Sequence, residues 1–336
     1  NLSRGVKKMH AMGLAHSDLS YNNVLIDPVE RSACMIDLDG LVVPGVFQAE
    51  VIGTAEFIDP EVLATKHLDK SDANRKLPNR LTDLHALPVL IYMFLLHRHP
   101  LKGGKVHDLD TEKDDLLSMG EMAMFIEHPT DVTNRPKLNQ VSKWDLPWAD
   151  IAKLPYAITG PYLKTLFDKV FIDGLHNPMQ RPNAEEWENA LLKTTDLMQK
   201  CHNTACEQKW YVFDNTNRPR CPFCGTAHEG TLPVLDLYYQ YQDTVWKPEN
   251  HRLMVYNDQY LFLWHVNRNI ARNEKLTPEQ KVPVGYFTFF KGKWVLVNQK
   301  LNSLKDLTED KEIPIGTMVE LTDGKKILLS KEEGGR

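Results

Sequence analysis

The sequence predicts a multidomain α+β protein, in which a mainly helical domain is followed by a small zinc-binding segment and an all-β sandwich. Three observations support this order. Apolar residues recur at helical spacing over roughly the first 195 residues, four of the five cysteines then fall in two close pairs, and the last hundred or so residues alternate short apolar runs with turn signals. We place the domains at 1–197, 198–232 and 233–336.

The bulk composition fits a folded protein and disfavours two kinds of partner. Hydrophobic residues make up 42% of the 336 residues and charged residues 25%, which allows a sizeable core. The formal net charge of -5 provides no basic field that would attract nucleic acid. The longest charge-free apolar run, Ala86 to Leu96, is too short to span a bilayer. We therefore expect neither a nucleic-acid partner nor membrane insertion.

The first domain contains three segments whose apolar spacing is clearly helical: Ala86 to Leu96, Tyr162 to Phe171 and Ala184 to Leu197. Pro88 lies inside the first of them and predicts a kink, because proline removes a helical hydrogen bond. The chain also opens within a helical pattern from Val6 to Met12, which predicts a truncated start.

A set of polar residues in this domain has the spacing that phosphoryl transfer requires. Asp18 precedes Asn23 by five residues, and Asp37 follows Asn23 by fourteen, at the end of a second apolar run. Transfer from ATP needs a carboxylate that receives the proton of the attacking hydroxyl and oxygen ligands that hold Mg²⁺ on the phosphates. Asp18 would be the catalytic base, and Asn23 and Asp37 the ligands. Asp39 is either a further metal ligand or a solvated turn residue before Gly40.

The segment that contains these residues resembles the eukaryotic-like protein kinase family, and further motifs follow in the family's order. His16 to Asn23 resembles the catalytic loop, and Asp37 to Asp39 resembles the metal-binding Asp-Phe-Gly with its glycine replaced. Gly53 to Glu61 is similar to the end of the activation segment, and Asp83 to Tyr92 to the buried central helix. The resemblance implies a kinase C-terminal lobe over residues 1–197.

The resemblance also implies roles for single residues. Glu61 is expected to pair with Arg181, and Asp83 to anchor the backbone of the catalytic loop. His16 is expected to be a packed structural histidine without a catalytic role. Ser17 stands where many kinases have an arginine, and no Ser, Thr or Tyr lies between Leu38 and Gly53, which predicts an activation segment that works without phosphorylation.

The sequence departs from the family in ways that leave alternatives open. Nothing resembles the glycine-rich loop or the β3 lysine, so we expect the nucleotide-clamping lobe to be absent and this fragment to be inactive alone. Ser20 and Tyr21 replace the lysine and proline typical of serine/threonine kinases. We interpret the chain as part of a serine/threonine protein kinase that uses ATP and Mg²⁺. The alternatives are a small-molecule kinase and a pseudokinase scaffold or kinase substrate that docks partners through its C-terminal modules.

The second segment carries two cysteine knuckles separated by fourteen residues, Cys201 with Cys206 and Cys221 with Cys224. Thiolates at this spacing close a tetrahedron around structural Zn²⁺, and a segment with so few apolar residues needs such a staple. His202 and His228 lie close enough in the sequence to replace one cysteine as a ligand. This use of cysteine is typical of a reducing compartment, so we expect a cytoplasmic location.

The last domain is predicted to be all-β, with tight turns at Asn257-Asp258, Lys291-Gly292 and Asp323-Gly324. The expected strands are Leu235 to Tyr241, Arg252 to Tyr256, Tyr260 to Val266, Val284 to Phe290, Trp294 to Asn298, Thr317 to Leu321 and Lys326 to Leu329. Their order resembles an FHA-like β-sandwich without a recognisable phosphothreonine-binding motif, which implies a docking role. The whole arrangement resembles bacterial tellurium-resistance kinases, which implies a von Willebrand A protein and a PP2C-type phosphatase as partners beside a protein substrate.

Overall fold

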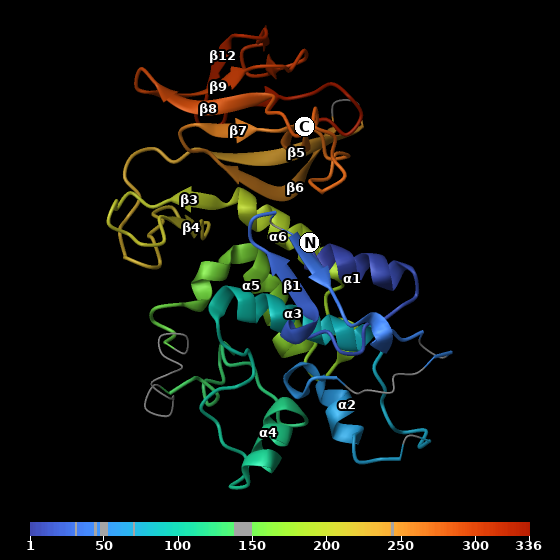
Figure 1. The fold of residues 1–336 in the computed structure, drawn as a ribbon. Coiled ribbons are helices and arrows are strands. Elements are labelled where there is room, and N and C mark those ends of the chain that lie inside the picture. The colour runs from blue at the N-terminus through green and yellow to red at the C-terminus, as the bar shows by residue number, and fades with distance from the viewer. Residues whose placement is uncertain (31, 44–45, 48–52, 70, 138–149, 243–244) are drawn as a thin grey trace. The chain divides into compact units, whose positions relative to one another are not determined.

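The computed structural model describes residues 1–30, 32–43, 46–47, 53–69, 71–137, 150–242 and 245–336. The chain divides into two compact units, Asn1–Leu191 and Leu192–Arg336. Helices dominate the first unit and antiparallel strands the second, so the predicted α+β class is confirmed (Figure 1). Within the described residues, no helix combines the length and the apolar character that crossing a bilayer requires.

The first unit packs its core on a helix that is buried along most of its length. The helices are α1 (Leu2–Ala11), α2 (Pro60–Thr65), α3 (Arg80–Leu96), α4 (Thr111–Met119), α5 (Gly160–Asp168) and most of α6 (Ala184–Asp196), and the hairpin is β1 (Val24–Asp27) with β2 (Ser32–Met35). The central helix is α3, which is apolar on all sides, as expected for a buried helix. It begins with a capping box of Asn79 and Thr82 and runs without interruption through Pro88.

Aromatic rings fix the later helices of this unit to α3. The ring of Tyr92 meets those of Phe125, Phe167 and Phe171 edge to face, with centroids 5.2 to 6.0 Å apart. The ring of Trp187 lies 5.0 Å from that of Phe167 and is fully buried. These edge contacts are the arrangement that aromatic quadrupoles favour, and they join α3, α5 and α6 in one core.

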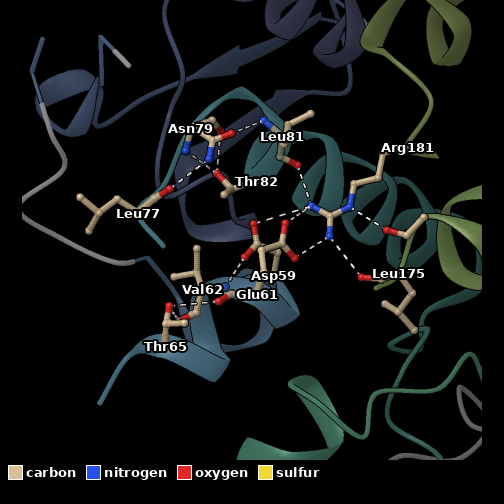
Figure 2. A network of polar contacts seen from close by, with 11 residues as sticks. Asp59, Glu61, Val62, Thr65, Leu77, Asn79, Leu81, Thr82, Leu175 and Arg181 are labelled. Carbon is tan, nitrogen blue, oxygen red and sulfur yellow. Dashed lines mark hydrogen bonds and ion pairs between the residues drawn. The ribbon is translucent and has the colours of Figure 1, made fainter. Parts of the chain in front are cut away.

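A buried ion pair connects three segments that are far apart in the sequence (Figure 2). The side chain of Arg181 is 0% exposed, and its guanidinium pairs with both carboxylate oxygens of Glu61, at 2.8 and 2.7 Å. The remaining donors reach the carbonyl oxygens of Gly174, Leu81 and Leu175, at 2.9 to 3.2 Å. All five N–H groups of the guanidinium therefore have acceptors. The pair between Glu61 and Arg181 that the sequence predicts is confirmed.

A second carboxylate lies beside this pair and is only half satisfied. Asp59 caps α2 by accepting the N–H of Val62 at its Oδ1, 2.9 Å away. Its Oδ2 is buried, has no hydrogen-bond partner, and lies 3.7 Å from Arg181 Nη1. Burial and the charge of the neighbouring Glu61 together raise the pKa of Asp59 to about 7, against the opposing effect of Arg181.

The second unit contains a small cysteine-bearing segment and a larger β region. Its elements are β3 (Met198–Lys200), β4 (Trp210–Val212), β5 (Val234–Gln242), β6 (Val245–Met254), β7 (Gln259–Leu261), α7 (Leu263–Val266), β8 (Gly285–Phe290), β9 (Lys293–Asn298), β10 (Lys305–Asp306), β11 (Lys311–Glu312), β12 (Met318–Glu320) and β13 (Ile327–Leu328). They form the pairs β3-β4 and β5-β6 and the sheets β12-β9-β8-β7 and β11-β10-β13. One core includes Leu253 of β6, Phe287 of β8, Leu296 of β9 and Leu304 beside β10, and so joins the larger sheets and the β5-β6 hairpin.

The predicted strand from Tyr260 to Val266 is wrong in its second half. Strand β7 ends at Leu261, and the helical turn α7 follows it. The ring Nδ1 of His265 accepts the backbone N–H of Phe262 at 3.2 Å, which closes the turn and takes up a donor that a strand would have paired. The short strands β10 and β11 were not predicted either, because two residues are too few to form a pattern.

We expect Arg181→Met to lower the free energy of unfolding of the first unit by about 3 kcal/mol, because it leaves Glu61 and three carbonyl groups without their donor. Urea unfolding followed by far-UV circular dichroism measures this. Lys102→Met is the control, since it removes an exposed pair with Glu56 and should cost less than about 1 kcal/mol. Equal losses in the two variants would contradict a central role for Arg181.

The raised pKa of Asp59 predicts a pH dependence of stability. A carboxyl whose folded pKa of about 7 exceeds its ordinary value of 3.8 stabilises the fold below 3.8, and this contribution is lost as the pH rises to 7. The wild type should therefore lose about 2 to 3 kcal/mol of stability between pH 5 and pH 8. Asp59→Asn keeps the capping oxygen and should remove that decline, whereas Asp27→Asn in the exposed hairpin should not. A decline that persists in Asp59→Asn would assign it to other groups.

Candidate functional site

Both carboxylate oxygens of Asp18 accept hydrogen bonds, and this fixes the orientation of the group. Its Oδ1 accepts the backbone N–H of Thr54 at 2.6 Å and the hydroxyl of Thr54 at 2.8 Å. Its Oδ2 accepts the side-chain amide N–H of Asn23 at 3.0 Å, and the same amide donates to the Asp18 carbonyl at 2.8 Å. Asp18 is half-buried and Asn23 is buried. Two segments separated by more than thirty residues therefore converge on one carboxylate.

The backbone of the loop before Asp18 is hydrogen-bonded to a buried carboxylate on α3. Asp83 is 1% exposed, and its Oδ2 accepts the backbone N–H of His16 at 2.9 Å and faces the ring of His10 at the same distance. The ring of His16 is buried and contacts the Ile36 carbonyl oxygen at 3.2 Å. The structure thus gives Asp83 the anchoring contact, and His16 the packed position, that the resemblance implied.

A close backbone approach brings Thr54 to Asp18. Ser17 adopts a left-handed conformation with φ 61°, and its hydroxyl donates to the Gly40 carbonyl at 2.7 Å. Gly53 has φ 106°, and a Cβ at this position would lie 2.9 Å from the Ser17 carbonyl oxygen. Only glycine meets both conditions, so the sequence Gly53-Thr54 is required for the contact with Asp18.

The β1–β2 hairpin brings the two predicted metal ligands to the same end. Val24 pairs with Met35, and the N–H of Ile36 donates to the Asn23 carbonyl at 2.9 Å, which extends the ladder by one step. Asp37 is the next residue, exposed and left-handed with φ 58°. Asp18 and Asn23 are joined directly. Asp37 is brought to the same end of the hairpin, but it shares no described hydrogen bond with either of them.

The structure adds one residue that the sequence analysis did not assign. Thr54 lies in the motif from Gly53 to Glu61, but its contact with Asp18 was not predicted. A hydroxyl residue directly after Gly53 was the available signal. Asp39 is exposed in the helical turn Leu38–Gly40. Much of the predicted phosphorylation-independent segment, at 44–45 and 48–52, lies outside the described residues.

The second unit holds a cluster of four cysteines whose Sγ atoms all lie within 4.8 Å of one another: Cys201, Cys206, Cys221 and Cys224. The Sγ atoms of Cys201 and Cys224 are 3.6 Å apart, and those of Cys206 and Cys221 3.8 Å. Thiolates at about 2.3 Å from a tetrahedral Zn²⁺ are about 3.8 Å apart, whereas a disulfide requires about 2.05 Å. The cluster therefore has metal-binding geometry, and all four cysteines are free of disulfides.

The thiols of this cluster have opposed ionisation tendencies. Burial raises the pKa of Cys201 to about 12 and raises that of Cys221 as well. Hydrogen bonds with the hydroxyl and the backbone of Thr226 lower the pKa of Cys224 to about 6. A divalent cation offsets the cost of gathering several thiolates, because it supplies the opposite charge at their centre. The donor set thus fits a soft, tetrahedral metal ion.

The two histidines of this segment lie outside the sulfur cluster. The rings of His202 and His228 are 4.2 Å apart, tilted by 50°. The Nδ1 of His202 accepts the N–H of Glu229 at 3.2 Å, and that of His228 lies 3.4 Å from the Gln199 amide. Four sulfur atoms complete the tetrahedron without either ring. The substitution of a histidine for one cysteine, which the sequence left open, is not needed.

Known proteins resemble this chain only in part. A scan against known protein families finds no match. Over 105 residues, 30% of the chain, it is 30% identical to the serine/threonine-protein kinase RAD53 of Saccharomyces cerevisiae, of which 13% is covered. Over 141 residues, 39% of the chain, it is 27% identical to the serine/threonine-protein kinase oca2 of Schizosaccharomyces pombe, of which 19% is covered. The chain spans less than a fifth of either relative.

The class of protein that these findings define is a coarse one. The chain is an α+β protein with a four-cysteine cluster of metal-binding geometry, and part of its sequence is similar to serine/threonine protein kinases. The bacterial origin that the resemblance implied stays a prediction, and both of these relatives are yeast proteins.

Proposed function

We propose that this chain is the catalytic half of an ATP-dependent protein kinase of bacterial type that phosphorylates serine or threonine hydroxyls. The observation that carries the proposal is the carboxylate of Asp18, oriented on one oxygen by Thr54 and on the other by Asn23. A carboxylate that accepts a proton needs a fixed direction toward its substrate, and hydrogen bonds to both oxygens provide it. The partial similarity to two serine/threonine kinases supports the same reaction class.

The residues present fit the cofactors that this reaction uses. The amide nitrogen of Asn23 donates its hydrogen bonds to Asp18, so the amide oxygen is the atom that would bind Mg²⁺. Asp37, exposed at the same end of the hairpin, would supply the second oxygen ligand. Mg²⁺ held by these two residues would neutralise negative charge on the phosphates of ATP. Asp18 would take the proton of the substrate hydroxyl as the hydroxyl oxygen bonds to the γ-phosphorus of ATP. The bond from that phosphorus to the bridging oxygen would break, and ADP would leave.

The second unit would serve docking in the same protein. We assign structural Zn²⁺ to the four-cysteine cluster, because its sulfur spacing fits a closed tetrahedral site without an open position for catalysis. We assign the β region to an FHA-like sandwich that binds partners, a von Willebrand A protein and a PP2C-type phosphatase by the resemblance. A cytoplasmic location agrees with five cysteines that are free of disulfides. The alternative function is a pseudokinase scaffold or kinase substrate that uses only these modules.

We expect Asp18→Asn and Asp37→Asn in the full-length protein to reduce ATP-dependent labelling of a protein substrate by about 10³-fold each, because they remove the base and a metal ligand. Asp27→Asn is the matched control, since Asp27 is exposed in the same hairpin and its carboxylate accepts the backbone N–H groups of Val29 and Glu30. Thermal melts establish that the variants fold. Labelling that is unchanged in both variants would remove the kinase proposal and favour the scaffold.

We expect the purified protein to contain about one equivalent of Zn²⁺, and Cys221→Ser to lose it and to melt the second unit at lower temperature, because metal binding there is folding energy. Elemental analysis and thermal unfolding measure the two effects. Cys34→Ser is the control, since Cys34 is exposed and lies in the first unit. Protein prepared without chelator that holds no zinc, or equal losses in both variants, would contradict the assignment.

A further inference from the structure

An open apolar hollow of about 300 Å³ lies on the first unit, beside the candidate catalytic loop. It is lined by Tyr21, Leu90, Met93, Phe94 and His97. Leu90 is buried and forms its floor, whereas Tyr21 and Phe94 are 46% and 44% exposed. Single exposed apolar residues are common on protein surfaces, but here two large rings border one concavity of the smallest size that binding pockets have.

The walls of the hollow are held in place. Helix α3 ends at His97, which is left-handed with φ 52° and donates its N–H to the Met93 carbonyl. This end leaves Phe94 exposed on the last turn of a helix that is buried from Thr82 to Tyr92. On the opposite side, the ring of Tyr21 rests edge-on against that of Phe57, with centroids 5.3 Å apart. The hollow is therefore part of the fold and needs no rearrangement to exist.

Tyr21 and the ring of Phe57 that supports it both lie close in the sequence to residues of the Asp18 site. Tyr21 follows Asp18 by three residues, so their Cα atoms are at most about 11 Å apart. Phe57, which supports Tyr21, follows Thr54 by three residues, and Thr54 donates two hydrogen bonds to the Asp18 carboxylate. If a substrate polypeptide places a hydroxyl at Asp18, a side chain about two to four residues from the hydroxyl-bearing residue would reach the hollow.

The lining selects by its chemistry. It contains no carboxylate, ammonium or guanidinium group, and its only polar side-chain groups are the Tyr21 hydroxyl and the His97 ring, so a charged side chain would lose water there without an ion-pair partner among these groups. An apolar side chain would gain by leaving water. We propose that the hollow binds an apolar side chain, such as leucine or methionine, of the polypeptide that is phosphorylated. Tyr21 and Phe94 would thereby determine specificity. The identity of the bound polypeptide as a substrate rests on the proposed kinase function, whereas the hollow is observed independently of that function.

The test uses the full-length protein and peptides with one serine and a single variable residue at each of four positions on either side. We expect leucine to exceed arginine and aspartate in kcat/KM by about tenfold at one position. Phe94→Glu should reverse this preference in favour of arginine. Leu116→Glu, at a residue of α4 that is 47% exposed, should leave it unchanged. A flat profile in an active wild type, or the same preference in Phe94→Glu, would overturn the inference.

A binding measurement separates this inference from the kinase proposal. Fluorescence anisotropy of the labelled leucine and arginine peptides should show tighter binding of the leucine peptide to the wild type and the reverse for Phe94→Glu. If no peptide is phosphorylated but this pattern appears, the kinase proposal fails and the apolar site stands. If the peptides bind alike, the site is refuted. Sedimentation that shows a dimer abolished by Phe94→Glu would identify a second copy as the occupant and would also refute it.

Discussion

The buried guanidinium of Arg181 is the constraint on which the geometry of the first unit depends. A charge with no exposure to water must have every N–H group bonded, since an unpaired donor in the interior costs as much as the bond would have gained. Its acceptors come from α2, from the first turn of α3 and from the segment before Arg181 (Figure 2). These segments are free to move only together. Because α2 follows directly on the Thr54 segment, the ion pair also holds the group that orients Asp18.

The ion pair has a consequence for its neighbourhood. Glu61 occupies two of the five donors, and three backbone carbonyls occupy the rest, so none remains for the Oδ2 of Asp59. Burial without a donor at this oxygen disfavours the charged form of the carboxyl, and this raises its pKa. The capping bond from Val62 to Oδ1 survives protonation, because it uses the other oxygen. The helix cap uses Asp59 and the ion pair uses Glu61, so the two interactions do not compete for the same carboxylate.

Much of this could be predicted from the sequence where short-range order carries the signal. The α+β class and the three helices follow from periodicity. The pair of Glu61 with Arg181, which are 120 positions apart, was implied by the resemblance to protein kinases. The second half of the strand expected at Tyr260 could not be recognised as helical, because the four-residue turn of α7 is too short for a periodic pattern and its cap is a contact of the His265 ring. The contact between Thr54 and Asp18 and the hollow between Tyr21 and Phe94 join residues 36 and 73 positions apart. No local pattern encodes such contacts.

The amide of Asn23 explains why one residue type is needed at the centre of the candidate site. Its nitrogen donates to both the carbonyl and the carboxylate of Asp18, so the loop of five residues is closed by a single side chain. An aspartate at this position would place a second negative charge 3 Å from the first and would lose both bonds. An alanine would leave the Asp18 Oδ2 without a donor. Only an amide offers a donor toward Asp18 and, on the same planar group, an oxygen for a cation. The proposed base and the proposed metal ligand are therefore positioned by the same hydrogen bonds.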